Sequence, residues 1–191
     1  MTRWWWVRHG PTHEKSFVGW RDVPADLSDE AQIGRLNDFL PENAVLVSSD
    51  LSRAVATADC LSKKHERLPH AAALREFNFG VWDGMSFDAV AQRDPQLSRA
   101  FWETPGTVAP PEGESWNAVS ARVAEFVQET TLRFSGRDII AVAHIGVILT
   151  QLGRAHAVPA EKALGQKIDH LSVTQIRLGE TIETGPINHI P

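Results

Sequence analysis

Cysteine is almost missing from this 191-residue sequence, in which Cys60 is the single example. One thiol excludes an internal disulfide framework and any metal site built from several cysteines. We expect Cys60 to serve as a small apolar residue on a helix.

Long apolar stretches are also lacking. No stretch approaches the roughly 20 apolar residues that are needed to cross a bilayer. The apolar run near the N-terminus, residues 4–7, is too short for a secretion signal, and charged residues follow it at once. No targeting or spanning segment is visible, so we expect a cytoplasmic protein that has no membrane partner.

An excess of positive charge is the third absence. The chain has 19 Lys and Arg against 24 Asp and Glu, for a formal net charge of −5. This balance argues against a nucleic-acid partner and against anionic lipid, because both favour basic surfaces. If the protein binds an anion, a few well-placed residues must do it.

The length and the absence of internal divisions favour one domain over residues 1–191. The sequence shows no internal repeat, no low-complexity tract and no linker rich in Gly and Ser. With 42% hydrophobic residues, a chain of this length can bury one sizeable core.

Short apolar runs alternate along the chain with longer segments in which apolar residues recur every three or four positions. The runs are typical of buried strands, and the longer segments predict amphipathic helices. We predict strands over residues 4–7, 44–47 and 139–143, and helices over residues 28–40, from 51 into the charged run 63–67, over 115–133 and from 146. Ser28 is the expected cap of the helix that begins there.

This alternation predicts a three-layer α/β/α sandwich with a mainly parallel central sheet. The alternating pattern over residues 171–178 adds a strand that we expect to be antiparallel and at the sheet edge. Residues 77–113 interrupt this alternation of strands and helices with prolines, glycines and short helical pieces. A connection of that length is often a lid or a specificity element, and a plain surface excursion is the alternative.

The residues that follow the three predicted strands share one chemistry. In an open α/β sheet, ligands bind beyond the carboxyl ends of the parallel strands. Arg8 and His9 end the first strand, Arg53 follows the second, and His144 follows the third. We therefore expect two arginines and two histidines to meet at one edge of the sheet.

A phosphate group explains why these four side chains would gather. They repel one another when all are charged, and an anion removes that repulsion. Arginine offers planar, permanently charged donors that match phosphate oxygens in a bidentate manner. Arg53 and His144 also lie at predicted helix N-termini, where free N–H groups favour anions. Gly10 and Gly146 would leave room for close backbone approach.

Five motifs in this order resemble the histidine phosphatase superfamily, which includes the cofactor-dependent phosphoglycerate mutases. The resemblance covers nearly the whole chain and implies the phosphoglycerate mutase-like version of the predicted fold. The motifs are Arg8-His9-Gly10 with Thr12, residues 48–53, Glu76 within residues 74–84, Gly113-Glu114-Ser115, and Ala143-His144-Ile145-Gly146.

The resemblance implies a nucleophilic His9 flanked by Arg8, Arg53 and His144, with Glu76 as the proton donor. A neutral imidazole nitrogen can attack phosphorus if a hydrogen bond at the other ring nitrogen fixes its tautomer. Two arginines and a second histidine can stabilise the transferring phosphoryl group, so we expect neither a metal nor a cofactor. The predicted substrate-binding residues are Arg8, Thr12, Arg53, His144 and Ile145.

Several assignments keep an alternative. Glu14, Glu112 or Glu114 could take the place of Glu76, and Thr12 could end a turn instead of binding phosphate. Trp20, Trp82 and Trp102 are candidates for the pocket wall, whereas Trp4, Trp5 and Trp6 are expected in the strand core. We expect no metal site and mostly structural or solvated side chains among the remaining histidines, which are His13, His65, His70, His156, His170 and His189.

The reaction we expect is hydrolysis of a small phosphorylated metabolite through a phosphohistidine. Residues 75–84 and 168–174 are most similar to α-ribazole phosphatase-like members, so α-ribazole 5′-phosphate is a candidate substrate. An asparagine that many members have soon after Thr12 is missing here. The alternatives are a phosphoglycerate mutase, which the short tail after residue 178 disfavours, and a binding module without turnover. A second copy of the chain is a candidate partner.

Overall fold

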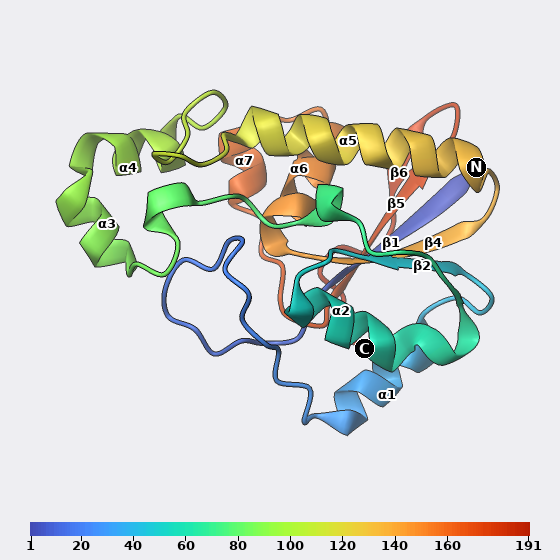
Figure 1. Cartoon of the computed structure of the whole chain (residues 1–191). Coiled ribbons are helices and arrows are strands. Elements are labelled where there is room, and N and C mark those ends of the chain that lie inside the picture. Colours follow the sequence, from blue (N-terminus) through green and yellow to red (C-terminus); the bar gives the residue numbers. More distant parts are fainter.

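A computed structural model describes the whole chain, residues 1–191, except for the side chain of Ser62. A six-stranded sheet forms its centre in the order β3-β2-β4-β1-β5-β6 (Figure 1). The strands are β1 (Thr2–Arg8), β2 (Val45–Ser48), β3 (Glu66–Arg67), β4 (Asp138–Ala143), β5 (Val173–Leu178) and β6 (Ile182–Thr184).

The sheet is parallel from β3 to β1 and antiparallel beyond. β4 pairs in parallel with β1 on one side and with β2 on the other. Val142 lies opposite Val7 and Ser48 in these two ladders, so the three strands end at the same level. The sheet therefore brings the residues that follow β1, β2 and β4 to one edge, as predicted.

The last predicted strand is antiparallel but is not at the edge. β5 pairs antiparallel with β1, and its other side pairs with β6. The short hairpin from Leu178 to Ile182 makes β6 the outermost strand, so the prediction of an edge position for residues 171–178 was wrong.

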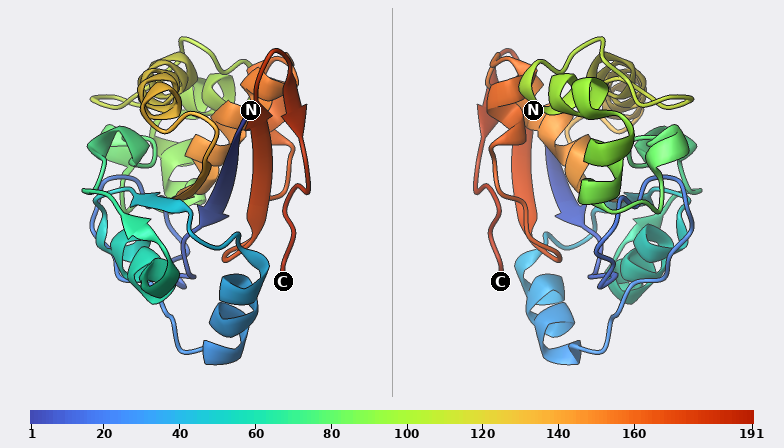
Figure 2. Two further views of the ribbon diagram at one scale, coloured as in Figure 1. Left: turned by 90° about the vertical axis from the view of Figure 1, so that its right-hand side faces the viewer. Right: turned by 90° about the vertical axis from the view of Figure 1, so that its left-hand side faces the viewer.

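Helices cover both faces of the sheet. Helices α1 (Glu30–Phe39) and α2 (Ser52–Leu61) lie on one face, and α5 (Trp116–Arg133) and α6 (Ile145–Ala155) lie on the other (Figure 2). The hydrophobic core accordingly consists of two clusters, one on each face of the sheet. Trp4 and Trp6 belong to the cluster under α5 and α6, whereas the partly buried Trp5 packs on the α1 side. This architecture confirms the predicted α/β/α sandwich.

Helix boundaries differ from the predictions by one or two residues. Asp29, not Ser28, caps α1, because its side chain accepts a hydrogen bond from the Gln32 N–H at 2.9 Å. Ser115 caps α5 in the same manner, through the Ala118 N–H at 3.2 Å. The helix predicted to continue into the charged run 63–67 is an exception, because α2 ends at Leu61 and is followed by a 3₁₀ turn (Ser62–Lys64) and then by β3.

The excursion 77–113 is helical in part and closed at its base. It contains a 3₁₀ turn (Gly80–Trp82), α3 (Phe87–Arg93) and α4 (Pro95–Glu103), which project at one end of the molecule. At the base, the Val81 N–H donates to the Pro111 carbonyl at 3.0 Å, and the Glu114 N–H donates to the Asn78 carbonyl at 2.8 Å.

Gly80 is required at this base. It has φ +51°, and a Cβ there would collide with the Pro111 carbonyl oxygen and with the backbone at Gly113. The remaining short elements are the 3₁₀ turn Ala72–Leu74 and α7 (Ala160–Leu164). In the part of the chain that is described, no helix combines the length and the apolar character needed to cross a bilayer.

Candidate active site

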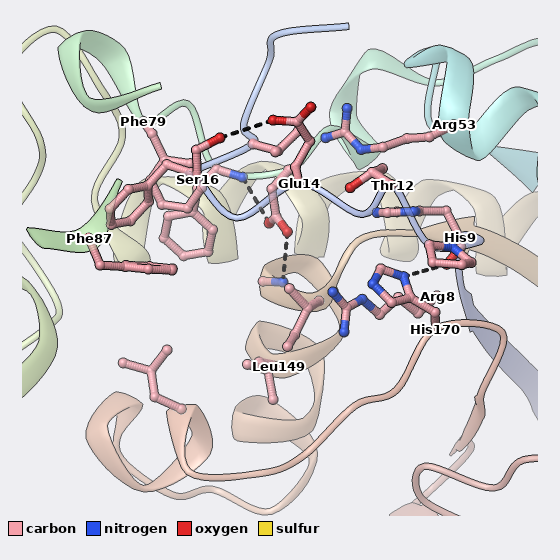
Figure 3. A pocket seen from close by; sticks show the side chains of 18 of the residues that line it. Arg8, His9, Thr12, Glu14, Ser16, Arg53, Phe79, Phe87, Leu149 and His170 are labelled. Atoms are coloured by element: carbon pink, nitrogen blue, oxygen red, sulfur yellow. Dashed lines mark hydrogen bonds between the residues drawn. The ribbon is translucent and has the colours of Figure 1, made fainter. Parts of the chain in front are cut away.

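A cavity of about 560 Å³ opens beyond the carboxyl ends of β1 and β4. Six of the predicted site residues line it: Arg8, His9, Thr12, Arg53, Glu76 and Ile145 (Figure 3). The seventh, His144, is fully buried behind them, and its ring centroid is 5.0 Å from that of His9. The sequence prediction thus identified a set of side chains that the fold does bring together.

The His9 ring is held in one tautomer. Its Nδ1 lies 2.7 Å from the Gly10 carbonyl oxygen, which can only accept a hydrogen bond. Nδ1 therefore carries the hydrogen, and Nε2 has a free lone pair when the ring is neutral. Burial, together with the positive charge of Arg53, holds the pKa of His9 well below its usual range. The neutral, nucleophilic form is therefore the resting form at neutral pH.

His144 adds a second neutral imidazole. Burial and the neighbouring His9 hold its pKa well below the usual range. Both of its ring nitrogens are buried and make no hydrogen bond with the described residues. Buried polar atoms in native proteins generally have a partner, so a pair of unmatched ring nitrogens points to a ligand or solvent site.

Arg8 and Arg53 approach the cavity from different elements. Arg8 ends β1, and its Nη1 donates to the Ile168 carbonyl at 2.6 Å. Arg53 lies in the first turn of α2 and is 1% exposed, and its two Nη atoms donate to the carbonyls of Arg21 and Gly19 at 3.1 and 2.7 Å. The Nε atoms of both arginines are buried without a partner among the described residues. Each guanidinium is thus anchored at one end and has donor capacity left over.

Glu76 is a buried carboxyl beside this cationic group. It is 4% exposed, and its two oxygens accept hydrogen bonds from the N–H groups of Phe77 (2.9 Å) and Gly146 (3.2 Å). Burial raises the pKa of Glu76, although those two hydrogen bonds and the charges of Arg53 and Arg8 oppose the shift. A raised pKa is what a carboxyl needs in order to hold a proton for a leaving group.

The alternative carboxyls are placed differently. Glu114 is paired with Arg122 at 2.8 Å, and neither Glu114 nor Glu112 lines the cavity. Glu14 does line it, but it is paired with Arg21 at 2.9 Å, and that arginine lowers the pKa of Glu14. Of the four carboxyls, Glu76 is the one that combines burial, a raised pKa and a place beside His9 and the arginines.

Gly10 and Gly146 permit close packing of protein atoms at the floor of the cavity. A Cβ on Gly10 would lie 2.6 Å from Leu27 Cδ2. A Cβ on Gly146 would collide with the Glu76 carboxylate and the Phe77 ring. The N-terminus of α6 can therefore approach Glu76 closely only because residue 146 has no side chain.

The sequence analysis did not place His170 in the cavity. It lines the cavity, its ring centroid is 5.3 Å from that of His9, and its Nδ1 lies 3.0 Å from the His9 carbonyl oxygen. The similarity of residues 168–174 to members of the same family was the signal in the sequence that could have pointed to this histidine.

No group of three or more His, Cys, Asp or Glu that could hold a metal ion occurs among the described residues.

The aromatic wall was only partly anticipated. Of the three tryptophans that were candidates for the pocket wall, Trp102 does line the cavity. Trp82 is fully buried and donates to Asp94 at 2.8 Å, so its proposed place in the pocket wall was wrong. Trp20 also lies outside the wall, because its Nε1 donates to the Glu76 carbonyl and its ring stacks under Arg75.

A sequence model of the histidine phosphatase superfamily (branch 1) matches residues 4–183. The chain belongs to this superfamily. The resemblance seen in the motifs is therefore confirmed, and the cavity described above lies where the motif residues of this superfamily member converge.

Relatives within the superfamily carry different names. A bifunctional protein of Mycobacterium tuberculosis is 32% identical over 136 residues, which are 67% of this chain and 33% of that protein, so the chain matches about a third of that relative's length. The adenosylcobalamin/α-ribazole phosphatase of Escherichia coli is 25% identical over 188 residues, covering 95% of this chain and 93% of the relative. A 2,3-bisphosphoglycerate-dependent phosphoglycerate mutase of Bartonella tribocorum is 25% identical over 177 residues, covering 85% of each chain.

A solved structure of the superfamily is similar over almost its full length. The complex of a mycobacterial glucosyl-3-phosphoglycerate phosphatase with inorganic phosphate superposes with a TM-score of 0.83 at 26% identity. The superposition covers 97% of this chain and 96% of that one.

Proposed function

We propose that the protein is a phosphomonoesterase that works through a phosphohistidine at His9 and needs no metal ion. One observation carries the proposal: the hydrogen bond from His9 Nδ1 to the Gly10 carbonyl leaves Nε2 as a free nucleophile in a cavity that two guanidinium groups line. Membership of the histidine phosphatase superfamily and a relative solved with inorganic phosphate support it.

The first step transfers the phosphoryl group to the enzyme. His9 Nε2 attacks phosphorus, the bond between phosphorus and the ester oxygen breaks, and Glu76 gives its proton to the departing alcohol. Arg8, Arg53 and His144 stabilise the transferring group, with Thr12 and the Ile145 N–H at the start of α6 as further donors. Because the phosphoryl group is loosely bonded in the transition state, such positioned charge is the main catalytic requirement.

The second step regenerates the enzyme. Glu76, now ionised, accepts a proton from a water molecule as that water attacks the phosphohistidine. The bond between nitrogen and phosphorus breaks, inorganic phosphate leaves, and His9 returns to its neutral form. One carboxyl therefore serves as acid and then as base, and its raised pKa suits both steps.

Hydrolysis is favoured over mutase chemistry because water has access to the cavity. A mutase must keep water from its phosphoenzyme while the sugar acid turns round. Here two aromatic side chains of the cavity wall are exposed to solvent, Phe87 by 56% and Trp102 by 40%. The mouth of the cavity is therefore open to solvent, which favours hydrolysis over phosphoryl shuttling.

Among small phosphorylated metabolites, α-ribazole 5′-phosphate is the named candidate. The Escherichia coli relative supports this choice through its name and through its match to almost the whole chain. The missing asparagine after Thr12 weighs against an identical mode of phosphate binding. An assay of a panel of phosphorylated metabolites with α-ribazole 5′-phosphate included tests the choice.

The test of the reaction is hydrolysis of 4-nitrophenyl phosphate in the presence of EDTA. We expect turnover in the wild type, none in His9→Ala, and normal turnover in the control His156→Ala, which alters an exposed histidine near Thr184. Acid-labile but base-stable label on the protein would identify the phosphohistidine. Phosphate binding without turnover would support a silent binding module instead, and isomerisation of phosphoglycerate would support a mutase.

A further inference from the structure

Aromatic side chains form the part of the cavity that is remote from His9. Phe17 is at the centre of this group, with ring centroids 4.9 Å from Phe79, 4.5 Å from Phe87 and 6.1 Å from Trp102. Figure 3 shows Phe79 and Phe87 on one side of the cavity and Arg8, His9 and His170 on the other. The cavity therefore has one cationic end and one aromatic end.

Two rings of the aromatic end are exposed although they are large and apolar. Phe87 begins α3 and is 56% exposed, and Trp102 near the end of α4 is 40% exposed. Exposed aromatic rings gathered at a cavity mouth gain free energy when an apolar ligand covers them, and ring stacking adds to that gain. Burial of these two rings on binding therefore favours a ligand that carries a flat, apolar group next to its phosphate.

Among the residues that line the cavity, the arginines lie at the other end. Arg8 and Arg53 lie at the floor, and the remaining cationic candidate of the wall near the mouth, His13, is paired with Asp26 at 2.8 Å. In Figure 3, Glu14 lies between the aromatic and the cationic ends. Ser16 (3.1 Å) and Arg21 (2.9 Å) donate hydrogen bonds to its carboxylate, which keeps the negative charge at the cavity wall.

We propose, on the basis of the proposed function, that the site selects phosphomonoesters whose alcohol part is aromatic and carries no negative charge of its own. A second carboxylate or phosphate would lose its hydration against the rings and would face Glu14, whose partner Arg21 is already engaged by Glu14 and Asp83. Phosphoglycerates and bisphosphoglycerates are therefore poor ligands, because Glu14 and the aromatic rings of the excursion 77–113 both disfavour them.

A pair of matched substrates tests the charge rule. The phosphate monoester of 4-hydroxyphenylacetate and that of the corresponding amide have nearly the same shape and the same leaving group, but differ by one negative charge. We expect kcat/KM to be about tenfold higher or more for the amide. Equal values, or a preference for the acid, would overturn the proposal even though turnover itself would uphold the phosphatase.

Substitutions at the mouth should move this ratio. Phe87→Lys supplies a cation and Glu14→Gln removes the wall charge, so each variant should reduce the amide preference several-fold. Leu132→Lys is the matched control, because Leu132 is 74% exposed on α5 and does not line this cavity. The proposal fails if the ratio is unchanged in both mouth variants or if it shifts equally in the control.

Binding measurements keep the inference testable without turnover. Benzylphosphonate and 4-carboxybenzylphosphonate carry the same phosphonate group, which cannot be hydrolysed. Calorimetry should show at least about tenfold tighter binding of benzylphosphonate to the wild type. Comparable affinities would contradict the charge rule, whereas the expected difference in a protein without activity would uphold the rule and refute the proposed reaction.

Discussion

Arg53 has two tasks in one buried side chain. Its Nη atoms donate to the carbonyls of Gly19 and Arg21, and its Nε has no partner among the described residues. Arg53→Lys keeps the charge but cannot reproduce the planar fork, so we expect kcat/KM for 4-nitrophenyl phosphate to fall by roughly 10²–10³. Arg99→Lys, at an exposed position of α4, should stay near the wild-type value. Near-normal activity of Arg53→Lys would remove this arginine from catalysis.

The role of Glu76 as a proton donor can be tested by comparing substrates whose leaving groups do and do not need a proton. Glu76→Gln should slow hydrolysis of an alkyl phosphate far more than that of 4-nitrophenyl phosphate, because nitrophenolate leaves without a proton. Steady-state assays with both substrates measure this difference. Equal losses would mean that another group is the acid.

The pH profile gives a second readout of the same carboxyl. Because the pKa of Glu76 is raised, the protonated form persists to higher pH than for an exposed glutamate. Hydrolysis of an alkyl phosphate should then decline as pH rises through that pKa, when the proton needed by the leaving group is lost. Glu76→Gln should lack this decline, and a retained decline would assign it to a different residue.

At the scale of elements, two helical glycines provide a matched comparison. A Cβ at Gly146 in α6 would collide with Glu76 and Phe77, whereas a Cβ at Gly34 in α1 would meet nothing within 4 Å. We expect Gly34→Ala to stabilise the protein by about 0.5–1 kcal/mol, since alanine favours the helix. Gly146→Ala should lower both stability and activity, because Glu76 or α6 must move.

Urea unfolding and the alkyl phosphate assay measure both effects. Normal activity in Gly146→Ala would show that the close approach of α6 to Glu76 is not needed for catalysis.

Elements that bury apolar runs were predictable, and short polar ones were not. β1, β2 and β4 are apolar on both faces, so their sequences alone predict strands. β3 and β6 have two and three residues and rely on pairing with a neighbouring strand rather than on their own pattern. Asp29 and Ser28 are adjacent residues that can both cap a helix, so the sequence could not decide between them.

The site was predictable where it follows strand ends and was hidden where it depends on distant loops. Arg8, His9 and His144 follow directly from the parallel sheet. The tautomer of His9 depends on a backbone carbonyl, which has no signature in the sequence. The aromatic wall joins Phe17 to α3 and α4, and backbone bonds between Phe17 and residues 84 and 85 align these segments.

At the scale of the whole molecule, the buried histidines predict loss of stability in acid. The pKa values of His9 and His144 are lowered, so below about pH 6.5 the unfolded chain binds protons that the folded chain does not. Each histidine contributes up to about 1.4 kcal/mol of destabilisation per pH unit. Glu76 acts in the opposite sense, since its raised pKa favours the folded state at lower pH.

His65 and His170 have lowered pKa values as well, so the histidines should outweigh Glu76, and the free energy of unfolding should fall between pH 7 and pH 5. Urea titrations at several pH values measure the fall, and His144→Gln should make it shallower. An unchanged slope in that variant would show that His144 is not the group responsible.

The oligomeric state and the cellular location of the protein are also properties of the whole molecule. The homodimer and the cytoplasmic location expected from the sequence stay predictions. Sedimentation equilibrium tests the first, and microscopy of a tagged chain in its native cell tests the second.

Because hydrogen bonds close the base of the excursion 77–113, we expect that this segment can be exchanged between related proteins. Its two ends meet at Asn78–Val81 and Pro111–Glu114, while His9 and both arginines belong to other parts of the chain. Recombination between family members at these two points would replace the part of the aromatic wall that α3 and α4 carry and leave the phosphoryl-transfer residues in place. A chimera that received residues 82–110 from the Escherichia coli relative should therefore inherit the donor's preference among phosphate esters while retaining a His9-dependent turnover.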